Sequence, residues 1–169
     1  MATTYEAIAT VTVGSGGAAN MEFTSIPQTY TDLVIKASTR TNYGTQADAC
    51  ILQFNSNSSS YSMIRLQGSG SAASSNSNTT NIRAVTDEDN ATANTFGSWE
   101  AYVPNYTLSN NKSVSLDSVM ENNATAAEQN LVAGLWSNTA AITSIKLLPL
   151  NGTAFKQYST ATLYGIKNS

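Results

Sequence analysis

The 169-residue chain has no histidine, a single cysteine and little charge. Without histidine, the commonest general base and the commonest metal-ligating side chain are missing, as are the Ser–His and Cys–His nucleophile pairs. Cys50 alone can form neither an intrachain disulfide nor a cysteine-based zinc site. Its place in the apolar segment ACILQF predicts a small buried hydrophobe. We therefore expect no enzymatic activity, no catalytic residue, no metal site and no cofactor.

Charged residues make up 11% of the chain, with a net charge of −3 and a pI of about 4.7, against about 25% charged residues in a typical globular protein. The eight Lys and Arg residues form no basic cluster, which argues against nucleic-acid binding. A surface of hydroxyl and amide groups forms hydrogen bonds without long-range repulsion. Such a surface suits packing against other copies better than free diffusion as a monomer.

Long apolar runs are also missing. None approaches the about 20 residues that span a bilayer, and the start of the chain, MATTYEAIATVTV, lacks the basic residues and unbroken apolar centre of a secretory signal. We expect no membrane association and a chain made in a cytoplasm.

The sequence contains ten short segments with alternating apolar and polar residues, rich in β-branched and aromatic side chains. Gly, Asn, Ser and Pro clusters separate them, as is typical of strands joined by turns. The pattern predicts one all-β domain over residues 1–169, an antiparallel β-sandwich of jelly-roll type. Asn151–Gly152 and the 54–61 loop are expected as hairpin turns, and 123–131 is the only helix candidate. The predicted strands are 5–13, 21–26, 31–38, 49–54, 61–67, 96–103, 113–120, 129–136, 142–149 and 160–166.

Residues 67–81, QGSGSAASSNSNTTN, carry no charge and no aromatic side chain. With so little apolar surface to bury, this segment is expected to lack structure of its own. Two interpretations remain: a mobile loop, or an adaptable polar surface that neighbouring subunits order. The second fits the scarcity of charges available to protect sheet edges from pairing.

Two carboxylate groups are candidates for chemistry. The DED sequence at 87–89 has the oxygen ligands that Ca²⁺ prefers but lacks the spacing of a calcium loop, so a solvated acidic turn is the better interpretation. Glu100 and Asp117 lie on different predicted strands and would suit an acid–base pair only if the fold brought them together. The sequence does not fix their separation, and catalysis is disfavoured.

Four aromatic residues could form a platform for stacking a sugar ring or contacting a partner. Aromatic residues in strands more often belong to the core, so the core interpretation is preferred for this set. The residues are Trp99, Tyr102, Tyr106 and Trp136.

Three segments resemble a group of small virion structural proteins of tailed bacteriophages, common in phages of marine bacteria and cyanobacteria. They are FTSIPQTYTDLVIKASTRTN (23–42), LQFNSNSSSYSMIRLQGSGS (52–71) and AFKQYSTATLYGIK (154–167). The shared pattern matches here at Phe23, Ile26, Pro27, Thr29, Tyr30, Leu33 and Ile35, at Phe54, Asn55 and Tyr61, and at 163–167.

Four residues of these segments are expected to maintain the fold. Pro27 should end the strand before it, and Tyr30 should pack its ring inside while its hydroxyl reaches the backbone at a corner. Asn55 should bond its own backbone and hold the following loop. Gly165 should lie where a neighbouring backbone or large side chain approaches closely.

The resemblance implies a virion protein, assembled in the host cytoplasm, whose partners are other virion proteins. The leading hypothesis is a capsid decoration or cement subunit, a homo-oligomer with a trimer as the expected symmetry, that bridges and stabilises capsid subunits. The alternative is a tail fibre, knob or appendage domain that binds host-surface carbohydrate.

Overall fold

The computed structural model describes residues 4–45, 47–121 and 127–167, and within them the chain forms twelve β-strands and no helix. Ten of the strands coincide with the predicted segments, to within a few residues at their ends. The strands are β1 (Tyr5–Thr12), β2 (Met21–Phe23), β3 (Asp32–Thr39), β4 (Asp48–Phe54), β5 (Tyr61–Gly68), β6 (Ala73–Asn78), β7 (Ile82–Thr86), β8 (Gly97–Val103), β9 (Lys112–Glu121), β10 (Ala127–Trp136), β11 (Ile145–Pro149) and β12 (Thr160–Ile166).

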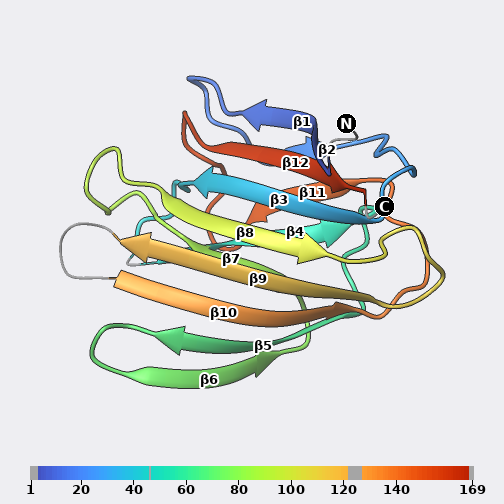
Figure 1. Ribbon diagram of the computed structural model, residues 1–169. Helices are drawn as coiled ribbons and strands as arrows, with labels where there is room; N and C mark the ends of the chain where they lie inside the picture. The colour runs from blue at the N-terminus through green and yellow to red at the C-terminus, as the bar shows by residue number, and fades with distance from the viewer. Residues whose placement is uncertain (1–3, 46, 122–126, 168–169) are drawn as a thin grey trace.

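The strands form two antiparallel sheets that pack face to face (Figure 1). The eight-stranded sheet has the order β1-β12-β3-β8-β9-β10-β5-β6, and the four-stranded sheet has the order β2-β11-β4-β7. In Figure 1 the larger sheet faces the viewer, with β1 at its top edge and β6 at its bottom edge. The predicted β-sandwich is confirmed.

Alternation of side chains explains how the sheets pack. β9 shows it most clearly, since every second residue from Lys112 to Met120 is buried and the residues between them are exposed. The buried faces of both sheets form one core. At its centre, the Trp136 ring lies 5.5 Å from the Phe54 ring and 6.2 Å from the Tyr61 ring.

β6 and β7 were not predicted. β6 falls in the polar run 67–81, so the expectation that this run lacks structure of its own is wrong. The first residues of the run complete β5, and the chain turns at 69–72. It then returns as the edge strand β6, which pairs with β5 in continuous register. The only helix candidate, 123–131, forms the start of β10 from Ala127 onward, and its residues 123–126 lie outside the described residues.

Both expected hairpin turns are also wrong. The 54–61 loop joins β4 to β5, and the loop containing Asn151–Gly152 joins β11 to β12, but in each case the two strands belong to different sheets. Asp48 holds the second loop by accepting hydrogen bonds from the backbone N–H groups of Asn151 and Gly152, each at 3.0 Å. These loops carry the chain from one sheet to the other.

Gly165 has the environment expected for it. A Cβ atom at this position would lie 2.3 Å from Cγ of Tyr30, so only glycine leaves room for the ring. The Tyr30 hydroxyl, which was expected to reach the backbone, interacts with the Glu6 side chain; burial and Glu6 together raise the pKa of Tyr30. Two other tyrosine hydroxyls do donate to backbone: Tyr106 to the Pro27 carbonyl oxygen, and Tyr61 to the Asn57 carbonyl oxygen at 3.2 Å.

Pro27 does not end a strand directly, since β2 stops at Phe23. Asn55 holds a loop, but a different one from that expected. Its Oδ1 accepts hydrogen bonds from the backbone N–H groups of Thr143 (2.8 Å) and Ser144 (3.2 Å), and its Nδ2 donates to the Ala141 carbonyl at 2.8 Å. Asn55 thus ties the end of β4 to the 141–144 loop that leads into β11.

Candidate functional site

The candidate site lies on the face of the eight-stranded sheet that points away from the smaller sheet, called here the outer face. Strand registers arrange its side chains in rows that cross all eight strands. One row runs from β1 to β6 through hydroxyl, charged and then apolar residues: Thr10, Thr162, Lys36, Glu100, Asp117, Leu131, Leu66 and Ser75. The chemistry of the face therefore changes from one end of the sheet to the other.

Near β6 the outer face carries an apolar patch, made of Ile64, Leu66, Val119 and Leu131. Leu66 and Leu131 lie directly opposite each other on β5 and β10 and are 54% and 51% exposed, and Ile64 is 61% exposed. Exposed leucines scattered singly are ordinary, whereas neighbours on adjacent strands form a contiguous surface suited to another protein.

In the middle of the outer face lies an open hollow of about 620 Å³ over β3, β8, β9 and β12, called here the polar hollow. Glu100 lies directly opposite Asp117 across β8 and β9, so the fold does bring together the two carboxylates that the sequence left apart. Lys36 pairs with Glu100 at 2.8 Å, and this contact raises the pKa of Lys36. The lining includes Lys36, Ser38, Ser98, Glu100, Tyr102, Ser115, Asp117 and Thr160.

The four candidate aromatic residues do not form one platform. Trp99, Tyr106 and Trp136 are at most 3% exposed and belong to the core, which agrees with the preferred interpretation. Tyr102, on the outward side of β8, borders the polar hollow, and the buried Trp99 also contributes to its lining. Asp32 accepts a hydrogen bond from the Tyr102 hydroxyl at 2.6 Å and raises the pKa of Tyr102 to about 12. The tyrosine is thereby held in place with its proton retained.

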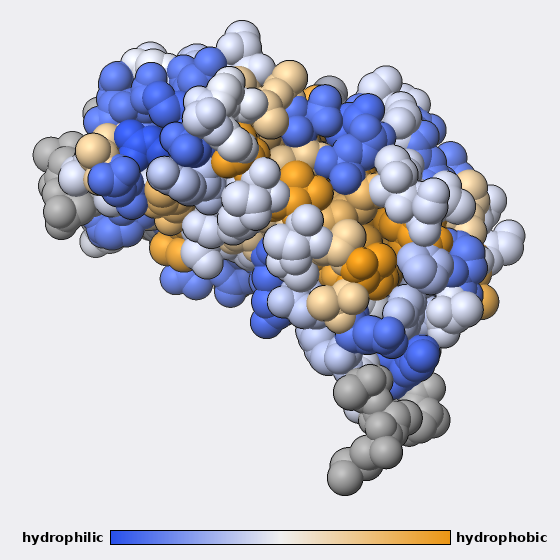
Figure 2. Space-filling view, turned by 90° about the horizontal axis from the view of Figure 1, so that it is seen from above, coloured by the Kyte–Doolittle hydropathy of each residue, from blue (hydrophilic) through white to orange (hydrophobic). Residues whose placement is uncertain are grey.

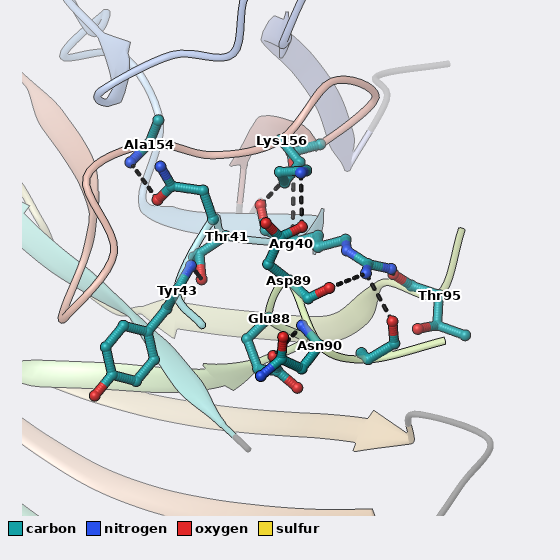
Figure 3. Close-up of polar contacts among 12 residues, drawn as sticks. Arg40, Thr41, Tyr43, Glu88, Asp89, Asn90, Thr95, Ala154 and Lys156 are labelled. Atoms are coloured by element: carbon teal, nitrogen blue, oxygen red, sulfur yellow. Dashed lines mark hydrogen bonds and ion pairs between the residues drawn. The ribbon is translucent and has the colours of Figure 1, made fainter. Parts of the chain in front are cut away.

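The acidic segment 87–89 is not the solvated turn that we expected. Asp87 and Glu88 are at most 1% exposed, and only Asp89 is exposed. Arg40 pairs with Asp87 in an isolated β-bridge, and its guanidinium donates hydrogen bonds to the carbonyl oxygens of Asp89, Ala91, Thr92 and Thr95 at 2.7–3.2 Å (Figure 3).

The same carbonyl oxygens already have a cation as their partner. They converge on a cation, as oxygen ligands of a metal would, but the cation is the side chain of Arg40. Lys156 closes the outside of this loop with an ion pair to Asp89 at 2.6 Å. Burial raises the pKa of Asp87, and Arg40 offsets that effect only in part. The arrangement folds the 87–96 loop onto the end of β3.

Cys50 is fully buried, as predicted, and burial raises the pKa of its thiol. A thiol in this state is a poor nucleophile. Among the described residues no group of three or more potential metal-ligating side chains occurs, and no helix there is long and apolar enough to cross a membrane.

Sequence reasoning missed the apolar patch. Alternation places Ile64 and Leu66 on one face of a strand, but nothing local marks that face as solvent-exposed. Apolar surface is not confined to the patch, since Figure 2, which looks onto the β1 end, shows hydrophobic groups near the middle of the view with hydrophilic groups on both sides.

Comparison of the chain with protein-family models, with curated proteins and with solved structures found no match.

Proposed function

We propose that this chain is a non-enzymatic structural protein of a bacteriophage virion, a decoration subunit that docks onto a repeated capsid surface through the outer face of its large sheet. The observation that carries this proposal is the apolar patch, where Leu66 and Leu131 face each other half-exposed. The low charge of the chain supports it, since few ions need to be desolvated on docking.

The energy per copy is small, which suits a decorating subunit. Full burial of a leucine contributes about 1.5–3 kcal/mol. Covering the exposed half of Leu66 and of Leu131 therefore contributes roughly 1 kcal/mol for each residue. Weak contacts of this size become effective when symmetry repeats them over a particle. A seam between capsid subunits would be held by many such contacts acting together.

We also propose that the sandwich is a jelly roll. The order β1-β12-β3-β8 in the large sheet is matched by β2-β11-β4-β7 in the small sheet, so strands in corresponding places are consecutive in the chain. This alternation between sheets supports a jelly-roll core of eight strands. The hairpins β5–β6 and β9–β10 then extend the large sheet beyond that core, and they carry all four residues of the apolar patch.

Binding of the purified chain to particles that lack it tests the docking role. The double substitution L66S/L131S should weaken binding to each site by about 30-fold, from a loss of about 2 kcal/mol. Leu108, 55% exposed but outside the patch, provides the matched control L108S, which should bind normally. Equal binding by the double variant and the wild type would show that docking does not use the patch.

A second candidate function, a tail appendage that binds host-surface carbohydrate, is favoured by the polar hollow. Its carboxylates and hydroxyls are suitable partners for sugar hydroxyls, and the Tyr102 ring borders them. Glycan-array binding that is lost in D117N and kept in L66S/L131S would favour this candidate over decoration.

A further inference from the structure

The edges of the two sheets differ in how they are protected from pairing with other chains. β1, at one edge of the large sheet, has a register irregularity between Ala7 and Ala9 and carries Glu6, which pairs with Lys167. In the small sheet, β2 is only three residues long. β7 is largely buried and carries Arg83. Short length, irregular register, charge and burial all discourage edge pairing.

β6 has none of these features. Its sequence, ASSNSN, contains no charge and no proline, and five of its six residues are exposed. Its pairing with β5 runs from Ala73↔Gly68 to Asn78↔Met63 without a shift in register. One side of the strand is bonded to β5, and the other is the open edge of the sheet. The edge therefore presents backbone N–H and C=O groups for a further strand.

We propose that the occupant of this edge is β6 of a second copy of the chain, paired antiparallel across a two-fold axis. A two-fold contact requires a surface to be complementary to itself. An uncharged Ser/Asn strand meets this requirement, because its own copy brings no like charge, and serine and asparagine side chains can hydrogen-bond across the seam. A charged or apolar partner peptide would find no matching side chain on β6.

The pairing joins two eight-stranded sheets edge to edge, with both outer faces on the same side. The apolar patches of the two copies then flank the seam, because Ser75 and Ser77 of β6 lie beside Leu66 and Ile64 of β5. Self-pairing does not depend on the virion role, and its symmetry differs from the trimer expected from the sequence.

Sedimentation velocity on the full chain, over a range of concentrations, tests the proposal. As its concentration rises, the wild type should change from a 17.8 kDa monomer to a species of twice that mass. The variant S75K/S77K places like charges on both sides of the seam and should raise the dimer dissociation constant by about tenfold or more. The matched control is S113K/S115K, with the same spacing on the same outer face but on the interior strand β9, and it should dimerise like the wild type.

Charge complementation separates a direct contact from damage to the fold. S75E/S77E alone should weaken dimerisation by a similar factor, and an equimolar mixture with S75K/S77K should restore a dimer of one copy of each. A wild-type chain that stays monomeric or forms trimers would overturn the proposal. Dimers that survive both variants, or a mixture that stays monomeric, would overturn the assignment to β6.

Discussion

Gly165 and Tyr30 are in contact so close that a single added methyl group cannot be accommodated: a Cβ at 165 would lie 2.3 Å from the ring carbon Cγ. G165A should therefore lower the free energy of unfolding by about 3 kcal/mol through overpacking. Urea denaturation measures the effect. Gly14, where an added Cβ would have nothing within 4 Å, gives the control G14A, which should change stability little. Similar losses in both variants would contradict the account.

Asn55 links two loops through its amide group, and it adopts a φ of 51°. N55A removes all of these hydrogen bonds and should cost about 2 kcal/mol of stability. N55D keeps an oxygen acceptor for Thr143 and Ser144 but loses the donor to Ala141, so its cost should be about half as large. Thermal unfolding of the two variants checks the order, and a smaller loss for N55A than for N55D would be inconsistent with these bonds.

Arg40 holds the 87–96 loop with four hydrogen bonds from one guanidinium. R40M leaves those carbonyl oxygens without their donor and should cost about 3 kcal/mol or more. R40K retains the charge without the planar fork and should fall between R40M and the wild type. In R40M, amide hydrogen exchange should be faster than in the wild type at 87–96 and little changed elsewhere. Uniform acceleration over the whole chain would argue against a local role of Arg40.

The buried carboxyl of Asp87 should make stability depend on pH. Burial raises its pKa in the folded state, so folding favours the protonated form. The contribution of Asp87 to stability is then greatest below the unfolded pKa of about 3.9 and is lost as the pH rises through the folded pKa. D87N has no carboxyl to ionise at this position and lacks this loss. The free energy of unfolding of D87N relative to the wild type should therefore increase from pH 3.5 to pH 7. Parallel stability profiles would show that Asp87 is not destabilised by burial.

Alternation of side chains predicted ten strands because nine of them bury side chains in the core and the tenth, β1, packs Ile8 and Val11 against it. β6 escaped prediction since neither of its faces is buried, and its place depends on backbone pairing with β5, which composition does not reveal. The proximity of Glu100 and Asp117 also escaped prediction. The register between β8 and β9 decides which of their side chains meet, and composition does not reveal that register. Gly165 was predictable, since a glycine within a strand indicates a close neighbour.

The burial of Asp87 could not be predicted from its acidic neighbours. Asp87 forms an isolated β-bridge with Arg40, a residue 47 positions earlier, whose side chain also holds the carbonyl oxygens of the loop that follows. Local composition predicted a solvated turn, and a long-range contact decided otherwise.

The location and copy number of the chain in intact virus particles test the central claim most directly. Electron cryomicroscopy at a resolution that traces the backbone should find it on the capsid exterior in hundreds of copies, on the order expected for a decoration subunit repeated by icosahedral symmetry, with the apolar patch against capsid subunits. Absence from mature particles, or tens of copies or fewer confined to the tail, would contradict the account.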